Sequence, residues 1–446
     1  MNNVNHVLIQ NGTIIDVENG SSFIGTIEVL EGKIRKVYKQ GDLLPTGIGV
    51  QDAEGKYIIP GLIDMHCHIN EGYAPHFVAA GVTSVRNTAG NVTALKRLIH
   101  ASNDAPTPRV YSADRMIDGS PGQWGPTSFG NFVTDNPEEA RKEVERQVKA
   151  GAKFVKLYGW IKPDVMEAAV DEAKKYGLEV SCDLLNSKEV TALDAARMGV
   201  TWFEHASGFA QEIYKGWNPL VDQSEWSHIN WDEPDKEKIK ALCEQMLTYN
   251  VKLCPTLVLF DQVNLFPEIW KPNNAVIEST YSETGLTKQW ESLSQHAQGL
   301  KEKNGFIGKF TKEVAKTYFE MGGTVVAGTD TPALMWTFPG MALHRELELF
   351  VEIGLSEMEA LQAATSKAAQ SIGLTDVGSI TPGKIADLVI LNENPLENIE
   401  HTKTIHRVMK GGKVYTQEEI LSHIPSDEFI NELMKEFMEE WGEVTV

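Results

Sequence analysis

The sequence predicts an α/β protein with a (β/α)8 TIM-like barrel and a small discontinuous β-sandwich domain formed by the N- and C-terminal segments. Two observations predict this fold. Between residues 60 and 372, eight short apolar runs alternate with amphipathic stretches, which is the pattern of parallel strands joined by helices. Residues 1–59 and 373–416 instead contain short β-type runs separated by turn residues. We expect these two segments to pair into one domain, and residues 417–446 to form a C-terminal helical extension.

The strands of the predicted barrel can be assigned in chain order. The first lies in YIIPGLIDMHCHI, and the other seven lie in GVTSVRN, PRVYSA, AKFVKLYG, LEVSCDLL, VTWFEHAS, VKLCPTLVLF and GTVVAGTD. Helices are expected at residues 137–151 and 162–177, among others, because apolar residues recur there at helical spacing. An open, doubly wound sheet is the alternative, but no GxGxxG follows the first strand.

Two predicted connections are longer than ordinary loops. They cover residues 209–236, after the sixth strand, and residues 260–305, after the seventh. Loops of this length usually form lids or contain secondary structure of their own. They hold five of the ten tryptophans of the chain, namely Trp217, Trp226, Trp231, Trp270 and Trp290. These aromatic side chains either pack the lid onto the barrel or contact the substrate.

The composition excludes several classes of partner. Forty-one basic and 62 acidic residues give a formal net charge of −21, which repels a phosphate backbone and an anionic membrane surface. We therefore expect no nucleic acid and no membrane as a partner. The start of the chain has no basic region followed by an apolar stretch, and the four cysteines form no CxxC pair. These features predict a cytoplasmic protein with reduced thiols.

The candidate metal ligands begin in IDMHCHI, the end of the first predicted strand. Alternation of side chains along a strand puts Asp64, His66 and His68 on one face, and imidazoles at i and i+2 can bind the same ion. Barrel enzymes gather their catalytic groups at the C-terminal ends of the strands. Three more candidates stand at such positions: Lys156, His205 and Asp330. A core histidine or a helix-capping aspartate is the alternative for each of the last two.

The sequence predicts a buried, reactive amine at Lys156. In KFVKLYG it shares a strand face with Phe154 and Tyr158, so it points inward if its direct neighbours face the helices. Burial of an unpaired lysine favours the neutral amine, which reacts with carbon dioxide. A structural ion pair is the alternative interpretation.

The motifs PGLIDMHCH, VKLYG, FEHAS, AGTD and PGKIADLVILNENPL resemble the amidohydrolase superfamily, in particular its imidazolonepropionase-like and dipeptidase-like members. The resemblance implies that His66, His68 and Asp330 bind one metal ion, and that Lys156, as a carbamate, bridges to a second ion held partly by His205. It also implies that Asp330 is catalytic, taking a proton from a bridging hydroxide and passing it to the leaving group. The implied cofactors are one or two divalent ions, zinc first and manganese or cobalt as alternatives, and carbon dioxide for carbamylation of Lys156.

Two positions depart from the pattern of the superfamily. Its members usually have a histidine at the end of the fifth strand, where VSCDLL has Asp183. Asp183 either replaces that histidine as a ligand, which suits a hard cation such as manganese or zinc, or binds a substrate amine beside a single ion. We favour the ligand interpretation. Asn87, at the end of GVTSVRN, stands where relatives commonly have an acid, which puts any inherited role of that position in doubt.

Substrate contacts are predicted at residues that follow the candidate ligands or the neighbouring strands: Tyr158, Trp124, Arg115 and Ser207. Arg86 and the loop DGSPGQWG can also reach the pocket, and surface positions are the alternative for these loop residues. The loops that determine the substrate contain no motif that names it.

The predicted function is that of a metal-dependent hydrolase in which a metal-bound hydroxide cleaves a C–N bond other than an internal peptide bond. The substrate class is a small molecule with an amide, dipeptide, cyclic amide, urea or carbamate group, aromatic if the lid tryptophans contact it. Hydrolysis of an ester or lactone, and a metal-dependent lyase or isomerase reaction, are the alternatives. A non-catalytic binding protein is a further one. We expect a homo-oligomer, with a dimer as the simplest form.

Overall fold

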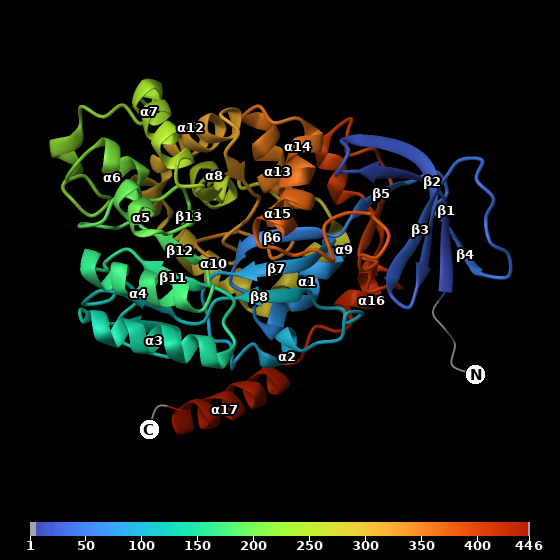
Figure 1. Ribbon diagram of the computed structural model, residues 1–446, viewed down its shortest axis with the longest axis horizontal. Coiled ribbons are helices and arrows are strands. Elements are labelled where there is room, and N and C mark those ends of the chain that lie inside the picture. The colour runs from blue at the N-terminus through green and yellow to red at the C-terminus, as the bar shows by residue number, and fades with distance from the viewer. Residues whose placement is uncertain (1–5, 445–446) are drawn as a thin grey trace.

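The computed structural model describes residues 6–444, and ten of its strands form two parallel sheets (Figure 1). The first sheet has the order β6 (Leu62–Cys67), β7 (Val82–Asn87) and β8 (Arg109–Ser112). The second has the order β10 (Asn131–Val133), β9 (Met116–Asp118), β11 (Val155–Tyr158), β12 (Val180–Asp183), β13 (Trp202–Glu204), β14 (Lys252–Cys254) and β15 (Thr324–Val325). The predicted α/β fold with parallel strands is therefore confirmed.

Backbone hydrogen bonds connect these two sheets on both sides. On one side the Met65 amide donates to the Ala327 carbonyl over 3.0 Å, which joins β6 to the segment that follows β15. On the other side the Lys153 amide donates to the Ser112 carbonyl over 2.8 Å, which joins β8 to the start of β11. The arrangement is consistent with the predicted barrel.

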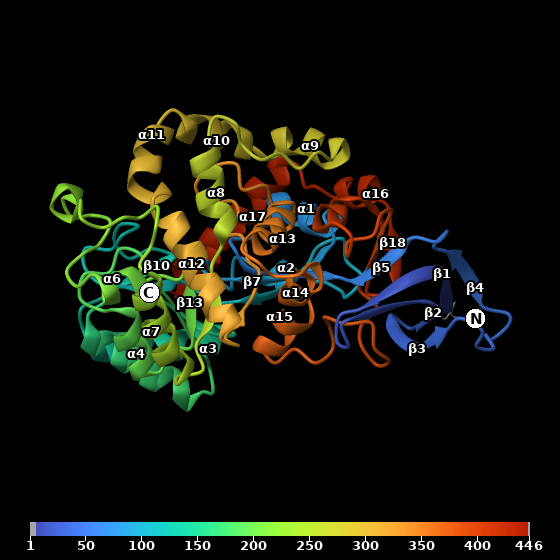
Figure 2. The same ribbon diagram turned by 90° about the horizontal axis from the view of Figure 1, so that it is seen from above.

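Helices lie outside the parallel strands, as Figures 1 and 2 show. They are α1 (Ala74–Ala79), α2 (Lys96–Ile99), α3 (Pro137–Ala150), α4 (Pro163–Lys175), α5 (Ala192–Met198), α7 (Lys236–Leu247), α12 (Ile307–Glu320), α13 (Ala342–Glu352), α14 (Glu357–Ala363) and α15 (Ser366–Ser371). The ends of α3 show the ordinary caps. Asn136 accepts a hydrogen bond from the Glu138 amide at the start of α3, and Gly151 ends that helix with a left-handed φ of 98°.

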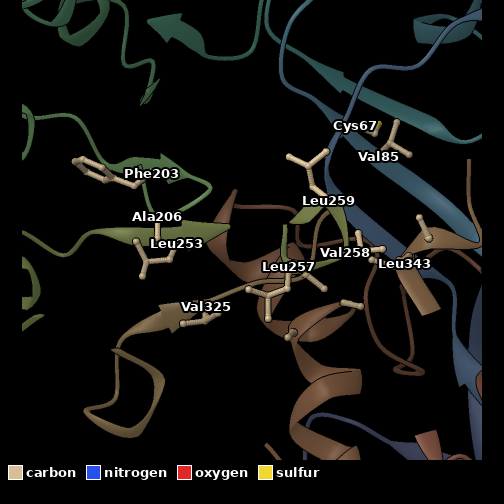
Figure 3. Packing of buried hydrophobic residues seen from close by; sticks show 14 of the residues in the cluster. Cys67, Val85, Phe203, Ala206, Leu253, Leu257, Val258, Leu259, Val325 and Leu343 are labelled. Atoms are coloured by element: carbon tan, nitrogen blue, oxygen red, sulfur yellow. The ribbon is translucent and has the colours of Figure 1, made fainter. Parts of the chain in front are cut away.

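The side of the strands that faces the helices is apolar. Phe203, Leu253 and Val325 are register partners on β13, β14 and β15, and Figure 3 shows them in the core cluster. Since side chains alternate along a strand, Trp202 and Glu204 point to the opposite, inner side. All four cysteines are buried and none forms a disulfide.

The two long connections contain secondary structure of their own. The first holds α6 (Phe209–Ile213) and η2 (Gln223–Trp226). The second holds α8 (Leu257–Leu265), α9 (Ala275–Tyr281), η3 (Ser282–Thr284), α10 (Leu286–Ser294), α11 (Ala297–Leu300) and η4 (Lys301–Gly305). The expectation that VKLCPTLVLF is one strand was wrong, because β14 ends at Cys254 and residues from Leu257 are helical. Thr256, with a left-handed φ of 49°, separates the two elements.

The lid tryptophans pack mainly against protein. Trp217 is buried and lies 4.7 Å, between ring centroids, from Trp231. Trp290 is buried and donates to the Pro332 carbonyl over 3.2 Å, and Trp270 donates to Glu348 over 2.9 Å. These contacts favour the packing interpretation for these four side chains.

The N- and C-terminal segments share one sheet beside the parallel strands (Figures 1 and 2). Its strands are β1 (His6–Asp16), β2 (Ser21–Leu30), β3 (Lys33–Lys39), β4 (Gly49–Asp52), β5 (Tyr57–Pro60), β16 (Leu388–Leu391), β17 (Ile405–Lys410) and β18 (Lys413–Tyr415). We call it the flanking sheet. β5 pairs with β16, and the chain enters β6 directly after Gly61. Only glycine fits there, because a Cβ would lie 2.2 Å from Thr83 Oγ1.

The chain ends in helices. After η5 (Ile399–Lys403), α16 (Gln417–Leu421) and α17 (Asp427–Val444) follow the flanking sheet, and Figure 1 shows α17 lying beside α2. Lys96 of α2 forms an ion pair with Glu440 of α17. Within residues 6–444, no helix has an apolar stretch of the length that a membrane crossing requires.

Candidate metal centre

Two histidines and one aspartate meet where β6 and β15 end. His66 Nε2 lies 3.0 Å and His68 Nε2 lies 2.8 Å from the same oxygen, Asp330 Oδ1. His205 Nε2 lies 3.9 Å from Asp330 Oδ2. The ligand atoms of His66, His205 and Asp330 all lie within 4.8 Å of one another. The structure therefore brings four of the predicted ligands into one cluster.

The backbone around Asp330 crosses very close to β6. The Thr329 and Asp330 amides both donate to the His66 carbonyl, over 2.9 and 2.7 Å. Gly328 permits this approach, since a Cβ there would lie 2.7 Å from the His66 nitrogen. Asp330 itself has a left-handed φ of 59°, a costly conformation for a residue other than glycine. Such strain is typical of functional sites and directs the carboxylate toward the two histidines.

A second left-handed residue brings His205 to the same place. Glu204 and His205 are consecutive, so a regular strand would put them on opposite faces. Both nevertheless contact His66. Glu204 Oε2 lies 2.7 Å from His66 Nδ1, and the His205 ring centroid lies 4.8 Å from that of His66. The φ of 61° at His205 accounts for this, because it ends the alternation after Glu204.

Thr256 and Glu346 hold His205 from behind. His205 Nδ1 lies 2.6 Å from Thr256 Oγ1, at the start of α8. Glu346 of α13 accepts the Leu257 and Val258 amides over 2.9 and 2.8 Å. Burial raises the pKa of Glu346 to about 8, although these two hydrogen bonds oppose the shift. The contacts fix the ring so that Nε2 faces Asp330 and Asp183.

Lys156 and Asp183 complete the cluster on the side of β11 and β12. Both side chains are buried, and Asp183 Oδ2 lies 3.4 Å from His205 Nε2. None of the described residues hydrogen-bonds the Lys156 amine. The predicted alternative, a structural ion pair of Lys156, is therefore not seen as a direct contact within residues 6–444. A buried amine without a partner is costly, which indicates that its partner is not a side chain of this cluster.

The residues present fit a divalent cation. His66 faces a carboxylate at both ring nitrogens, Glu204 at Nδ1 and Asp330 at Nε2. If Nδ1 donates to Glu204 in a neutral ring, Nε2 carries only a lone pair toward the Asp330 oxygen, and a cation bound by both atoms would satisfy both. Imidazole and carboxylate are ordinary ligands of zinc and related ions. Carbamylation of Lys156 would turn its unpartnered amine into one more oxygen donor.

Beneath the cluster lies a pair of buried charges that we call the floor: Arg86 and Glu204. Glu204 accepts hydrogen bonds from His66, from Arg86 over 2.8 Å and from Ser181 over 2.5 Å. The Arg86 guanidinium lies 4.1 Å from the Phe154 ring centroid and 4.3 Å from that of Trp202. His66, Glu204 and Cys254 form another group of closely spaced donor atoms, but the partners of Glu204 already occupy its oxygens. The floor thus orients His66 Nε2 toward Asp330.

Electrostatics keep the carboxylates of the cluster ionised. Burial opposes ionisation of Asp330, but His66, His68 and His205 outweigh it and hold its pKa well below the ordinary value. Burial likewise opposes ionisation of Glu204, and Arg86 and His66 outweigh it. The pKa of Asp183 is lowered mainly by His205, against the effect of burial. Asp64 is different: burial raises its pKa to about 7, and it accepts the Thr329 hydroxyl over 2.7 Å.

The predicted substrate contacts fall into two groups. Tyr158 lies next to the cluster, because it is the register partner of Asp183 on the neighbouring strand. Burial and the charge on Asp183 raise the pKa of Tyr158, and the exposed Trp124 ring lies 6.4 Å from the Tyr158 ring. The Ser207 hydroxyl accepts the Leu184 amide over 2.7 Å, so it supports the end of β12. Arg115 does not reach the site. Its guanidinium pairs with Glu143 of α3 over 2.7 Å, on the helical side of the strands.

Arg86 and Asn87 also have structural contacts. Arg86 lies in the floor rather than in a substrate pocket. Asn87 accepts the Ile69 amide over 2.8 Å and donates to the Ala89 carbonyl over 3.0 Å. It therefore ties the segment after His68 to the loop after β7, and an amide suits this role because it can both accept and donate.

Comparisons with known proteins show similarity over most of the chain. The profile of the amidohydrolase family matches residues 57–415. Ochratoxinase from Aspergillus niger is 26% identical over 334 residues, which cover 70% of this chain and 55% of ochratoxinase. The chain thus spans about half the length of that relative. An imidazolonepropionase from Pyrobaculum arsenaticum is 48% identical over 66 residues, 15% of this chain and 16% of its own.

Solved structures share the fold. A putative prolidase from Bifidobacterium longum superimposes with a TM-score of 0.69 at 23% identity, covering 98% of this chain and 99% of its own. The structure of A. niger ochratoxinase gives a TM-score of 0.64 at 20% identity, covering 92% of this chain and 95% of its own.

Proposed function

Because the chain belongs to the amidohydrolase family, we propose that it is a metal-dependent hydrolase that cleaves a C–N bond, other than an internal peptide bond, in a small molecule. The observation that carries this proposal is the buried Lys156 amine without a hydrogen-bond partner among the described residues, on the strand next to Asp183 and the histidine cluster. The relatives named above as ochratoxinase and imidazolonepropionase, and the prolidase-like fold, support a hydrolase of small molecules.

The proposal includes the finer architecture. We interpret the two parallel sheets as one closed (β/α)8 barrel over residues 60–372, because backbone hydrogen bonds join them on both sides. We interpret the flanking sheet as a β-sandwich domain of residues 1–59 and 373–416, and residues 417–446 as a helical extension. A cytoplasmic homo-oligomer that takes a small-molecule substrate remains our expectation.

Each residue of the cluster has a proposed role. His66, His68 and Asp330 would hold one ion, and His205, Asp183 and carbamylated Lys156 a second. Divalent ions in such a site supply a lowered pKa of water and a polarised scissile carbonyl. Asp330 takes the proton released from water and passes it to the leaving nitrogen, because His66 and His68 contact its Oδ1 and leave Oδ2, 3.9 Å from His205 Nε2, as the second oxygen. Tyr158 stays protonated owing to its raised pKa and donates a hydrogen bond to the substrate.

Asp183 is proposed as a ligand in place of histidine. Its Oδ2 faces His205 Nε2 at 3.4 Å, and its carboxylate is ionised despite burial. With Asp330 and a lysine carbamate it would make the site richer in oxygen, which suits manganese or zinc. Under the other interpretation, Asp183 binds a substrate amine beside a single ion.

The first experiment measures metal per chain by elemental mass spectrometry, on protein produced with zinc or manganese and with bicarbonate. Wild type is compared with Lys156→Ala, Asp183→Asn and Asp183→His. Two ions in wild type, reduced by Lys156→Ala and Asp183→Asn but kept by Asp183→His, support the proposal. One ion that none of the three substitutions changes would assign Lys156 and Asp183 to the substrate.

The second experiment tests the reaction. Metal-loaded protein is incubated with a panel of dipeptides, N-acyl amino acids, cyclic amides, ureas, carbamates and esters in 18O-labelled water. Label in the product of a C–N substrate supports hydrolysis. Product without label would indicate a lyase or isomerase, and turnover of esters alone would contradict the bond class.

A further inference from the structure

The chain after β13 makes a tight turn that packs against the residues following β12. His205, Ala206 and Gly208 have left-handed φ values of 61°, 49° and 81°, so the backbone leaves the direction of the strand before it enters α6. A Cβ at Gly208 would lie 2.8 Å from the Ala192 nitrogen and 3.0 Å from Leu184 Cδ1. The residues of this turn therefore lie beside the end of β12.

Two side chains of this segment hold the backbone that follows Asp183. The Ser207 hydroxyl accepts the Leu184 amide over 2.7 Å. The side-chain amide of Gln211, on α6, donates to the Leu184 and Leu185 carbonyls over 2.9 and 2.8 Å. Ser207 and Gln211 are both buried, and hydrogen bonds are stronger where water is excluded. We call these two residues the Asp183 clamp.

The clamp acts on Asp183 through the Leu185 amide. That amide donates to Asp183 Oδ1 over 2.9 Å, whereas Asp183 Oδ2 lies 3.4 Å from His205 Nε2. One oxygen is thus held by the backbone, and the other faces the cluster. Since the two oxygens of a carboxylate move together, the position of Leu185 determines where Oδ2 points.

An aspartate depends on this support more than a histidine would. The oxygens of an aspartate lie closer to the backbone than Nε2 of an imidazole does, so the backbone must bring a ligand aspartate to the ion. A histidine that binds an ion through Nε2 carries its proton on Nδ1, which then cannot accept the Leu185 amide. Loss of a partner that orients a metal ligand typically weakens metal binding by about 10- to 100-fold.

We propose that Ser207 and Gln211 are positioning residues for Asp183, and that they hold Leu184 and Leu185 so that Asp183 Oδ2 faces the second ion. The proposal rests on the proposed function, in which Asp183 is a ligand. Ser207, expected from the sequence to contact the substrate, then acts on the ligand instead. The first long connection, which begins with α6, also gains a direct link to the metal centre through Gln211.

The first test measures manganese binding without any substrate. Metal-stripped wild type and Gln211→Met are titrated with Mn²⁺ in the presence of bicarbonate, and free Mn²⁺ is followed by electron paramagnetic resonance. Methionine has about the length of glutamine and removes both hydrogen bonds. We expect the variant to bind one of its two ions about tenfold more weakly and the other within about twofold of wild type. Unchanged affinity for every ion bound would overturn the proposal.

Gln417→Met is the matched control for the loss of a buried amide. Gln417 of α16 is also buried and donates to a backbone carbonyl, that of Ala79, over 2.8 Å. Its substitution should lower the urea midpoint of unfolding but leave Mn²⁺ affinity within about twofold of wild type. Equal weakening of Mn²⁺ in Gln417→Met and Gln211→Met would mean that loss of stability alone explains the effect.

The other half of the clamp is tested at Ser207. Ser207→Ala removes the acceptor of the Leu184 amide and should weaken the same ion as Gln211→Met does. Ser207→Thr keeps the hydroxyl and should bind both ions within about twofold of wild type. Full affinity in Ser207→Ala would contradict the role of this residue.

The second test asks whether the clamp acts through Asp183. Gln211→Met is combined with Asp183→His, whose imidazole has no oxygen for the Leu185 amide. We expect Gln211→Met to change the Mn²⁺ affinity of the histidine variant by less than about twofold, although it costs about tenfold in wild type. A tenfold loss in both backgrounds would show that Gln211 affects the metal centre by another route, and would contradict the proposal.

A metal-free measurement separates this proposal from the proposed function. Amide hydrogen exchange of peptides that contain Leu184 and Leu185 is followed by mass spectrometry in metal-stripped protein. Exchange should be faster in Gln211→Met than in wild type and unchanged in Gln417→Met. This result, in a protein that binds no ion, would support the clamp and contradict the metal-dependent hydrolase. Unchanged exchange and Mn²⁺ affinity in Gln211→Met, with two ions bound and amides hydrolysed by wild type, would contradict the clamp and leave the hydrolase intact.

Discussion

The floor and the upper part of the metal centre solve the problem of buried charge in opposite ways. In the floor, Glu204 meets Arg86, Ser181 and His66 directly, and two aromatic rings enclose the guanidinium. A few ångströms above, Asp330 and His205 have left-handed backbones, and the Lys156 amine has no hydrogen-bond partner among the described residues. The same interior thus pairs Arg86 with Glu204 but leaves the Lys156 amine without a partner in the described part of the chain, at the place where a cation and a substrate are expected.

This contrast separates residues that stabilise the fold from residues kept for a reaction. Proteins commonly accept lower stability at sites that function requires. Substitutions in the floor should therefore lower stability, whereas substitutions in the upper part should lower activity and leave stability unchanged or raised.

The largest expected effect is on activity, at Asp330. Asp330→Asn removes the proposed proton acceptor without changing its size, and we expect kcat/KM to fall roughly a thousandfold. It is measured on the best substrate of the panel, together with metal content. Metal retained with activity lost assigns proton transfer to Asp330, whereas metal lost with activity identifies it as a ligand.

Asp64→Asn is the matched control for Asp330. Asp64 is a buried carboxyl on the same strand face as His66, but its oxygens accept hydrogen bonds from Thr329 and from the backbone amide of His66. Activity within about fivefold of wild type is expected, since its pKa of about 7 already makes it partly neutral. Equal losses in both variants would contradict a special role of Asp330.

The second effect is on stability, in the floor. Glu204→Gln leaves the buried Arg86 without its counter-charge, and removal of one partner of a buried ion pair typically costs about 3–5 kcal/mol. Urea unfolding of metal-stripped protein measures the loss. Ser181→Ala removes only one neutral donor to Glu204 and should cost about 1 kcal/mol. Similar losses in the two variants would mean that the floor does not depend on charge pairing.

The floor also shows where the sequence alone is insufficient. Strand periodicity predicted the inward face of β6, and the C-terminal ends of the strands predicted where Lys156, His205 and Asp330 would meet. Glu204 was missed because it stands next to His205, and alternation excludes two consecutive inward residues. The left-handed φ of 61° that allows both depends on the tertiary contact with Thr256. A charged residue within the apolar run VTWFEH was the available signal.

Other misses have the same origin. The apolar run VKLCPTLVLF is compatible with a buried strand or a buried helix. Glu346 accepts the first two amides of α8, and this contact favours the helix. Glu346 lies 88 and 89 residues further along the chain, so the local sequence does not show the contact. Arg115 follows a strand as a site residue would, but Glu143 on α3 attracts it to the helical side. Helices 137–151 and 162–177, in contrast, were predicted within two residues. Asn136 and Gly151 cap the first helix, and both helices begin with a proline, which are signals local to the sequence.

The third prediction is a gain in the free energy of unfolding, whereas the second is a loss. Lys156→Met replaces an unpartnered buried amine with an apolar chain of similar length, so metal-stripped protein should gain about 1–3 kcal/mol of stability. Lys410→Met is the control. Lys410 is also buried, but it donates to the Asn103 carbonyl over 2.7 Å, and its loss should destabilise. A loss of stability in Lys156→Met would show that the amine is paired in solution.

The smallest expected effect tests a buried titratable group that lies outside both regions. His344 of α13 has Nε2 at 2.9 Å from the Ala80 carbonyl and Nδ1 at 2.9 Å from the Thr402 hydroxyl, and burial lowers its pKa from 6.5 to about 4. Above pH 6.5 the ring is neutral in the folded and unfolded chain, so its stabilising contacts are fully present. As the pH falls from 6.5 toward 4, the unfolded chain takes up a proton that the folded chain does not, and stability is lost.

Between pH 7.5 and 5.5 this linkage amounts to about 1 kcal/mol for His344. The measurement is the urea unfolding free energy of wild type and His344→Gln at both pH values, so that titration of all other groups cancels in the difference. Wild type should lose about 1 kcal/mol more than the variant over that interval. Parallel pH profiles would mean that His344 is protonated within the fold. The buried fold would then accept a protonated imidazole whose two nitrogens contact only neutral groups. In that case the ion pair of Arg86 and Glu204 would not by itself explain the stability of the floor.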